Sequence, residues 1–246
     1  WQFVQPYLRD ALTESAGEID FLDVGCGSGI FSLLMAKHYN AKVIAIDKSN
    51  RAIDFAGKNA ILNDLEFQIQ HELYNVCSAP KEGSKIIGLY PPYHIYPEFI
   101  KEKIPQHARG GSNGQEEFKN QLAIASNHLA ENGIIFFNQM CLGDESGPDL
   151  LDYIPKLVVD NPSVIYTNVL PPIETKEFLE GVYRGDHRYF VDKVSSENPW
   201  VHYTVGIVKR DRKGEVIHVK HDIDLKGRSW EDRIKLHREI ALHEFR

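Results

Sequence analysis

Cysteine is scarce in this sequence. Three are present among 246 residues, at positions Cys26, Cys77 and Cys141. An odd number at wide spacing indicates neither a disulfide framework nor a zinc site. We therefore expect no metal site, and we expect a reducing compartment, the cytoplasm, as the location of the protein.

Long apolar runs are absent as well. No stretch approaches the roughly 18 consecutive apolar residues that a membrane span requires, and no signal peptide is visible. The sequence therefore predicts no membrane partner. The first residue is Trp1 rather than methionine, which leaves open that a segment precedes it.

Excess positive charge is also lacking. The chain has 28 Lys and Arg against 35 Asp and Glu, for a net charge of −7. This balance counts against a broad electrostatic grip on a nucleic-acid backbone, although it leaves a local basic patch open. The hydrophobic content of 42% is ordinary for a globular protein and allows a sizeable core.

The first distinctive stretch reads as strand, glycine turn, helix and strand. Residues 21–24 form a short apolar run of strand type, and glycines at 25, 27 and 29 break it. Glycine has no Cβ, so a ligand can approach its backbone closely. Apolar residues from Ile30 onward have helical spacing, and residues 43–46 form a second buried-type strand that ends at Asp47.

An acid in this place predicts the chemical class of a ligand. Asp47, at the tip of the second strand, is positioned to accept hydrogen bonds from a ribose beside the glycine turn. The stretch therefore predicts a nucleoside-bearing cofactor. A dinucleotide turn needs G-x-G-x-x-G, but this chain has Ile30 where the third glycine would stand. That difference counts against a nicotinamide oxidoreductase.

The order acid-apolar-Gly-x-Gly-x-Gly, from Asp23 to Gly29, resembles the signature of the class I, seven-stranded methyltransferases that depend on S-adenosyl-L-methionine (SAM). The resemblance continues through Asp47, Ala52, Ala56, Asn59 and Ala60. It implies SAM as the cofactor and S-adenosyl-L-homocysteine (SAH) as its product. The candidate cofactor-binding residues are Asp23, Gly25, Cys26, Gly27, Gly29, Asp47, Lys48 and Glu72.

Two of these candidates have alternative interpretations. Cys26 lies inside the turn and is expected to be a small filler rather than a nucleophile. A third strand is predicted over residues 65–69, and Glu72 follows its end. The resemblance implies that Glu72 contacts the adenine amine, while an ordinary solvated loop acid is the other interpretation.

A second motif lies at the end of the predicted fourth strand. Residues 86–89 are apolar and are followed by Tyr90-Pro91-Pro92-Tyr93. Two prolines stiffen the backbone and an aromatic ring can stack on a flat group. The motif resembles the Asn-Pro-Pro-Tyr of methyltransferases that modify planar amide or exocyclic amine nitrogens, including protein-glutamine N5-methyltransferases and amino-methyltransferases of nucleobases. The glycine loop at residues 109–118 resembles the loop of the glutamine enzymes.

The motif departs from that family at Tyr90, where the family has asparagine. A phenol offers one acceptor oxygen and its own proton, so it cannot replace a planar amide. Three outcomes remain open: a different acceptor atom, positioning by other residues, or cofactor binding without methylation. The candidate catalytic residues are Tyr90, Pro91, Pro92, Tyr93 and His94, of which Tyr90, Tyr93 or His94 would serve as orienting group or base.

Strands alternate with helices as far as residue 138, which predicts an α/β fold with a doubly wound, mostly parallel sheet and helices on both faces. Further expected segments are helices over 2–15, 50–62 after the N-cap Ser49, 115–129 and 150–159, a strand over 133–138, and a short helix over 175–179. A C-terminal antiparallel addition is predicted from strands over 163–170, 203–209 and 216–219, a turn at Pro171-Pro172, a hairpin turn at Lys213-Gly214 and a closing helix over 229–244.

We expect a single domain over residues 1–246, because no linker or repeat is visible. Residues of about 15–143 would bind SAM, and residues 144–246 would shape the acceptor side. The function predicted is methyl transfer from SAM to an unidentified acceptor, which could be a protein side chain, a nucleobase or a small molecule. The alternative is a catalytically inactive protein of this fold that binds SAM or SAH or serves in assembly. The oligomeric state stays open.

Overall fold

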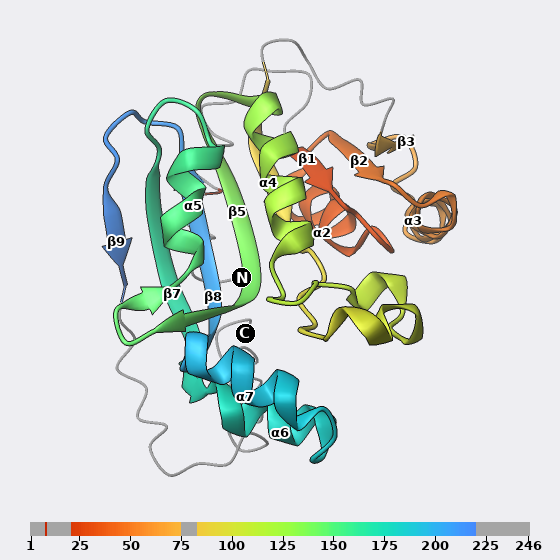
Figure 1. The fold of residues 1–246 in the computed structure, drawn as a ribbon. Helices are drawn as coiled ribbons and strands as arrows, with labels where there is room; N and C mark the ends of the chain where they lie inside the picture. The colour runs from red at the N-terminus through yellow and green to blue at the C-terminus, as the bar shows by residue number, and fades with distance from the viewer. Residues whose placement is uncertain (1–7, 9–20, 75–82, 220–246) are drawn as a thin grey trace.

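A computed structural model describes Leu8, residues 21–74 and residues 83–219 (Figure 1). The helices predicted over residues 2–15 and 229–244 fall outside these ranges, apart from Leu8. Cys77 and most of the loop after the third strand also lie outside the described residues.

The first half of the described chain forms a parallel sheet. Strands β1 (Phe21–Val24), β2 (Val43–Asp47), β3 (Ile69–Leu73), β4 (Ser84–Leu89) and β5 (Leu129–Asp144) lie in the order β3-β2-β1-β4-β5. The pairs β1–β2, β1–β4, β2–β3 and β4–β5 are all parallel. Chain order reverses between β1 and β4, and ligands of open parallel sheets bind at the carboxyl ends of the strands at such a point.

Antiparallel strands extend the sheet beyond β5. Strand β8 (Trp200–Lys209) pairs with β5, and β7 (Ser163–Glu174) pairs with β8. The short β6 (Gly147–Pro148) pairs with the end of β5, and β9 (Val216–His218) lies parallel to β7. The predicted fold class, a mostly parallel sheet with a C-terminal antiparallel addition, is confirmed.

Helices cover both faces of the sheet. Because side chains alternate along a strand, Leu22 and Val24 pack with α4 (Glu116–His128) and α5 (Leu150–Leu157) on one face. Phe21 packs on the other face with α2 (Ile30–Tyr39) and α3 (Asn50–Leu62). The predicted helices over 50–62, 115–129 and 150–159 are therefore confirmed within two residues. Ser49 caps α3 as expected, since its Oγ accepts from the N–H of Ala52 at 3.4 Å.

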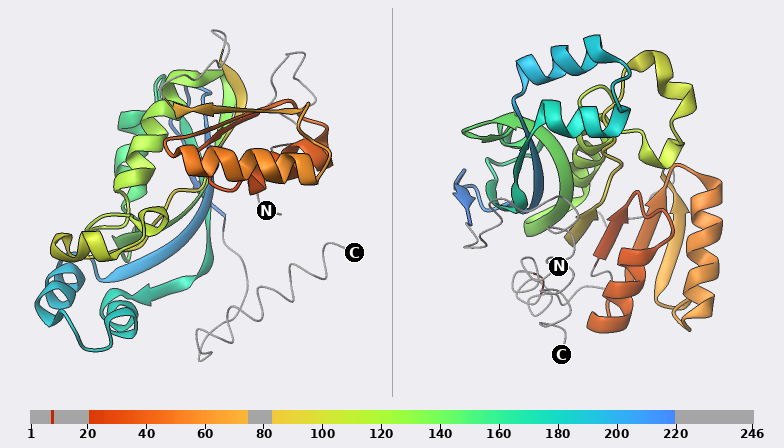
Figure 2. Two further views of the ribbon diagram at one scale, coloured as in Figure 1. Left: turned by 90° about the vertical axis from the view of Figure 1, so that its right-hand side faces the viewer. Right: turned by 90° about the horizontal axis from the view of Figure 1, so that it is seen from below.

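A third cluster lies at one end of the molecule. Helices α6 (Thr175–Tyr183) and α7 (Arg188–Glu197) pack beside each other there, next to the 3₁₀ helix η2 (Glu98–Lys103), as both views of Figure 2 show. Leu179 of α6 and Val191 of α7 are buried with Met140 and Val201 from the long strands β5 and β8. The sequence did not indicate α7.

The prediction of a third strand over residues 65–69 was wrong. The strand is Ile69–Leu73, and Phe67 lies before it and is 95% exposed. Turn-type hydrogen bonds hold the earlier residues, among them Gln68 N–H to Leu65 O at 3.0 Å. Glu72 consequently lies within β3, opposite Ile46, instead of after the strand.

Two C-terminal predictions also need correction. The chain does not turn at Pro171-Pro172, which lie inside β7 where its pairing with β8 shifts register. Proline is tolerated there because, among the described residues, no strand pairs with the other side of β7 at that level. Residues 210–215 do not close a hairpin onto β8, because β5 and β7 already occupy both its edges, so β9 joins the free edge of β7.

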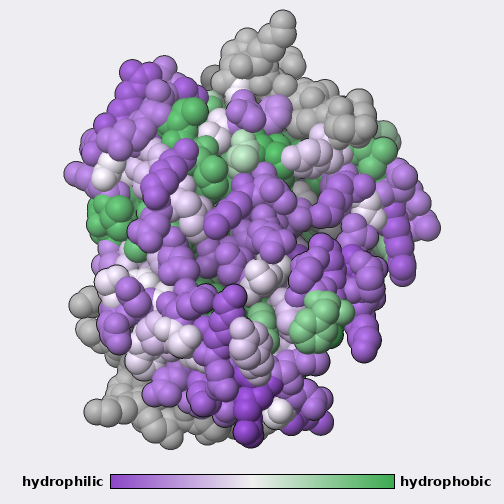
Figure 3. All heavy atoms as spheres, viewed as in Figure 1, coloured by the Kyte–Doolittle hydropathy of each residue, from purple (hydrophilic) through white to green (hydrophobic). Residues whose placement is uncertain are grey.

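The face of the molecule in Figure 3 carries mainly hydrophilic side chains with scattered hydrophobic ones. Among the helices of the described ranges, none has the length and apolar character needed to cross a membrane.

Candidate functional site

The glycine turn joins β1 to α2 at the carboxyl edge of the sheet. Gly25, Gly27 and Gly29 have φ values of 76°, 54° and 81°, a conformation that side chains with a Cβ rarely adopt. The N–H groups of Gly25 and Cys26 donate to the carbonyl of Ile46 at 2.8 and 2.9 Å. These bonds draw the turn over the end of the neighbouring strand β2.

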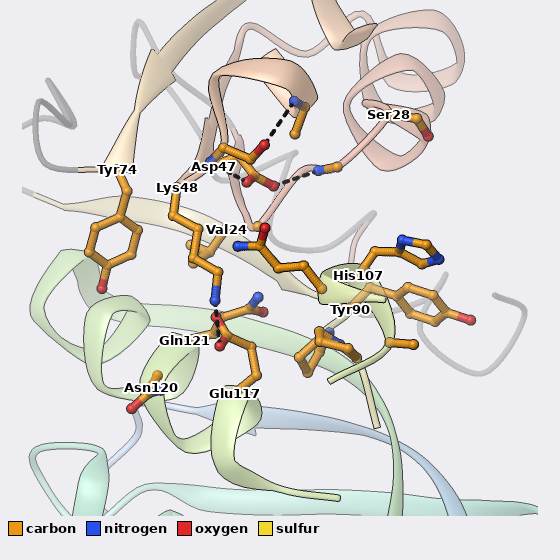
Figure 4. A pocket seen from close by; sticks show the side chains of 18 of the residues that line it. Val24, Ser28, Asp47, Lys48, Tyr74, Tyr90, His107, Glu117, Asn120 and Gln121 are labelled. Atoms are coloured by element: carbon orange, nitrogen blue, oxygen red, sulfur yellow. Dashed lines mark hydrogen bonds and ion pairs between the residues drawn. The ribbon is translucent and has the colours of Figure 1, made fainter. Parts of the chain in front are cut away.

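Asp47 binds the turn at its centre. The N–H of Gly27 donates to Asp47 Oδ2 at 3.0 Å, and the N–H of Ser49 donates to Oδ1 at 2.9 Å. The side chain is half-buried, and each carboxylate oxygen has a second lone pair for a ligand. Asp47 therefore orients the glycine turn and keeps acceptor capacity of its own (Figure 4).

Asp23 has a different role in the structure. Its side chain is buried, and Oδ2 accepts from the N–H of Ser32 at 3.1 Å and from the Ser32 hydroxyl at 2.6 Å. Ser32 lies in the first turn of α2, so the carboxylate caps that helix from the adjacent strand. Burial raises the pKa of Asp23 to about 6, although the two bonds from Ser32 oppose this change.

Cys26 is buried in the core cluster beneath α2. Burial raises the pKa of its thiol, so the thiolate that nucleophilic chemistry requires is disfavoured. Cys26 is therefore a small packing residue, as the sequence led us to expect.

A cavity of about 1530 Å³ opens at this edge of the sheet. Its lining includes Gly25, Gly27, Asp47 and Lys48 at one end. The other end is lined by Tyr90, Pro91, Pro92, Tyr93, His94 and by residues 105–108, which include the 3₁₀ helix η3 (Gln106–Ala108). The structure thus brings nine of the sequence-predicted site residues together around one space.

Four predicted residues do not line this cavity. Asp23 and Cys26 lie beneath the turn, as described above. Gly29 packs against α3, where a Cβ would lie 3.1 Å from that of Ala56. Glu72 projects from β3, where Gln70 Nε2 donates to its Oε1 at 2.5 Å, and the cavity is lined instead by Tyr74. Contact between Glu72 and an adenine stays a prediction.

Helix α4 contributes a wall that the sequence interpretation missed. Glu117, Asn120, Gln121, Ile124 and Asn127 all line the cavity. Their spacing of three or four residues places them on one face of the helix. The signal that could have revealed these residues is a mostly polar stripe, which is unusual on the side of a helix that lies next to a sheet.

Two of these side chains reach across to the cofactor end of the cavity. Glu117 accepts from Lys48 Nζ at 2.7 Å, a pair that joins α4 to the end of β2 (Figure 4). Gln121 is 5% exposed and lies against Gly25, where a Cβ would collide with its Nε2. The absence of a side chain at position 25 is therefore needed for α4 to approach the turn.

Two phenols, Tyr90 and Tyr93, line the aromatic end of the cavity, and a third, Tyr203, lies beside Tyr93. The Tyr90 ring contacts that of Phe31 edge to face at 5.5 Å between centroids, and the rings of Tyr93 and Tyr203 lie 6.3 Å apart. Burial, followed by the proximity of Tyr203 and Tyr93, raises the pKa of Tyr90. Burial also raises the pKa of Tyr93 and lowers that of His94.

A profile of one protein family matches residues 7–137, more than half of the chain. Its description is the methyltransferase small domain.

The chain belongs to the methyltransferase small domain family.

Curated relatives agree with this assignment. The release factor glutamine methyltransferase of Flavobacterium psychrophilum is 27% identical over 142 residues, which cover 54% of this chain and 50% of that protein. The U6 small nuclear RNA (adenine-(43)-N(6))-methyltransferase of Drosophila pseudoobscura is 26% identical over 187 residues, covering 65% and 58%. The chain thus spans little more than half the length of these relatives.

Solved structures agree on the fold. A protein from Galdieria sulphuraria, described as a sarcosine dimethylglycine methyltransferase, superposes with a TM-score of 0.51 over 86% of this chain and 84% of its own, at 9% identity. This likeness concerns the methyltransferase fold alone.

The site fits SAM, the cofactor of this methyltransferase family. A Cβ built on Gly27 meets no protein atom within 4 Å, so the space beside the turn is open to a ligand. The Asp47 carboxylate lies next to this space. Asp47 would accept from the ribose hydroxyls, and the backbone around Gly27 would bind the amino-acid part of the cofactor.

Proposed function

We propose that this protein transfers a methyl group from SAM to a nitrogen of a planar, uncharged group. The observation that supports the proposal is that one cavity has two chemically different ends. One end carries the glycine turn and Asp47, and the other carries Pro91, Pro92 and Tyr93. A volume of about 1530 Å³ leaves room for an acceptor group beside the cofactor.

The acceptor end favours a neutral group. Its lining residues are Tyr90, Pro91, Pro92, Tyr93, His94, Pro105, Gln106, His107 and Ala108. No Asp, Glu, Lys or Arg occurs among them, so a charged acceptor would lose hydration without gaining an ionic partner. A flat group would stack on Tyr93.

The relatives support nitrogen as the acceptor atom. The Flavobacterium protein is named for glutamine, and the Drosophila protein is named for the N6 atom of adenine. The glutamine side chain ends in a planar amide, and N6 of adenine is an exocyclic amine nitrogen on a planar ring, and both belong to the class that the Tyr90-Pro91-Pro92-Tyr93 resemblance also implies.

Bound SAM supplies a methyl group activated by its sulfonium charge, so positioning is the main task of the protein. Tyr93 would hold the plane of the acceptor, and the two prolines would fix the backbone carbonyls around it. His94 would accept the released proton, because its lowered pKa keeps the imidazole neutral near pH 7. Tyr90 would remain a protonated phenol, since its pKa is raised.

Two measurements test the proposed function. Calorimetry with SAM and with SAH should show binding to the wild-type protein. Transfer of a labelled methyl group should then be followed to a glutamine-containing peptide and to an adenine-containing RNA. Absence of heat and of any thermal shift at millimolar SAM would refute the proposal.

A second candidate function is a non-catalytic SAM-binding or assembly module. It is favoured by Tyr90, which occupies the position of the family's asparagine. Binding of SAH without methyl transfer to either acceptor would support this candidate. Methyl transfer that disappears in Asp47→Ala would exclude it.

A further inference from the structure

Asn138 lies beside the position where the asparagine of the motif is missing. Strand β4 ends at Leu89, which pairs with Phe137 of β5, so Tyr90 directly follows β4 while Asn138 is the next residue of the adjacent parallel strand β5. Paired side chains of a parallel sheet point to the same face. The chain therefore carries an amide one strand away from the position that lacks it.

The amide of Asn138 is only half satisfied. Its Nδ2 donates to the hydroxyl of Tyr203 at 3.1 Å, whereas Oδ1 is buried and has no hydrogen-bond partner. A buried acceptor without a partner loses its hydration without compensation, so its retention calls for an explanation.

The neighbouring amide of Gln139 makes more hydrogen bonds than that of Asn138. Gln139 Oε1 is also without a partner, but its Nε2 donates to two backbone carbonyls, those of Gly114 and Met140. Gln139 points to the opposite face of the strand, and its bond to Gly114 ties the glycine loop to β5. Its role is thus accounted for by the fold, while that of Asn138 is not.

Tyr203 determines how the Asn138 amide is oriented. It comes from β8 in the antiparallel part of the sheet, opposite Met140, and reaches Asn138 diagonally. Because Nδ2 is directed to the Tyr203 hydroxyl, Oδ1 is the atom left for another donor. Tyr93 and Tyr90, which line the cavity, also lie beside Tyr203.

We propose that Asn138, oriented by Tyr203, supplies the amide oxygen that accepts an N–H of the methyl acceptor. This inference rests on the proposed function and assigns the positioning task to a residue outside the motif. Oδ1 is covered in the structure, so the acceptor reaches it only when a side chain moves aside. Tyr90, which is 42% exposed and directly follows the strand beside Asn138, would be that side chain.

The test uses benzamide, a planar neutral primary amide, and N,N-dimethylbenzamide, which has no N–H. Binding of each to the SAH-saturated protein is measured by ligand-observed NMR. Wild-type protein is expected to prefer benzamide by roughly three- to tenfold, the value of one hydrogen bond. Asn138→Leu should lose this preference, and Tyr203→Phe should reduce it.

Control variants separate positioning from folding. Asn138→Asp keeps an acceptor oxygen and should retain the preference. Asn168→Leu removes a half-buried asparagine of β7, whose Oδ1 accepts from Thr204 Oγ1 at 3.1 Å, and should also retain it. SAH affinity and Tm are measured for every variant, and Asn138→Leu should keep wild-type SAH affinity.

The possible outcomes are distinct. An equal preference in wild type and Asn138→Leu, or no preference in wild type, overturns the assignment of Asn138 while SAH binding remains intact. Failure of the wild-type protein to bind SAH overturns the proposed function itself.

Discussion

The N–H of Gly27 donates to the carboxylate of Asp47 over 3.0 Å, which joins the glycine turn of β1 to the end of β2. Two features that lie 20 positions apart in the sequence therefore form one structural unit. Because of this hydrogen bond, the position of either residue affects how a ligand contacts the other.

Replacement of Asp47 by alanine should weaken SAH binding about 10- to 100-fold, because hydrogen bonds to a charged group contribute roughly 1.5–3 kcal/mol. SAH affinity should fall for two reasons, because the variant loses the direct contact with the ligand and also the hydrogen bond that orients the glycine turn. Asp47→Asn keeps one acceptor oxygen, so its affinity for SAH should lie between those of the wild-type protein and Asp47→Ala. Calorimetric titration with SAH measures all three proteins, and unchanged affinity in Asp47→Ala would contradict the assigned role.

Gly27 and Gly185 form a matched pair for testing the turn. Both have positive φ, 54° and 88°, and a Cβ on either meets no protein atom within 4 Å, but Gly185 lies in the turn between α6 and α7. Alanine at either position should cost about 1–2 kcal/mol of stability through the left-handed backbone. Only Gly27→Ala should also weaken SAH binding, by roughly tenfold or more, because the added methyl group fills ligand space. Similar SAH affinities of the two variants would show that Gly27 does not face the cofactor.

Asp23 should make folding stability depend on pH. Its pKa rises from 3.8 to about 6 in the folded protein, which therefore binds the proton more tightly than the unfolded chain does. The contribution of Asp23 to stability is greatest below pH 4 and falls, by an amount on the order of 3 kcal/mol, as pH rises through 6.

Asp23→Asn removes this dependence while it keeps an oxygen for Ser32. The difference in Tm between Asp23→Asn and wild type should therefore grow in favour of the variant from pH 4 to pH 7. Thermal denaturation of both proteins at several pH values gives the comparison. A constant difference over this range would mean that Asp23 does not titrate there.

His94 should set the acidic limb of the pH–rate profile if it accepts the proton. Burial lowers its pKa from 6.5, so protonation removes the base only below that pH. The rate of methyl transfer should rise with pH below 6.5 and be level at pH 7–8. His94→Ala should lower the rate about 10²- to 10⁴-fold, the usual contribution of general base catalysis, and abolish the acidic limb. If the acidic limb persists in His94→Ala, a group other than His94 accepts the proton.

Local sequence signals indicated residues that line one end of the cavity, and their contact with the cofactor stays a prediction. Gly25, Gly27 and Asp47 were recognised because backbone freedom and a strand-end acid leave signatures within a few residues. The N-cap Ser49 was equally visible. The aromatic wall was found through Pro91 and Pro92, since two prolines lack the N–H groups that a strand paired on both sides, as β4 is, would need in order to continue.

Longer-range packing decided what the sequence interpretation missed. Alternating Leu65, Phe67 and Ile69 indicated a strand, but pairing with β2 begins only at Ile69. A period-two pattern shows which residues could share a face, whereas the partner strand determines where pairing starts.

The sequence by itself determined the parallel fold, the glycine turn and its acid, because each depends on residues close together in the chain. Only the tertiary structure decided that Asn138 and Tyr203 join Tyr90 and Tyr93. Asn138 and Tyr203 are 65 positions apart and meet through the antiparallel pairing of β5 with β8. That register, set by cooperative pairing along ten residues of each strand, is not encoded in the neighbourhood of either side chain.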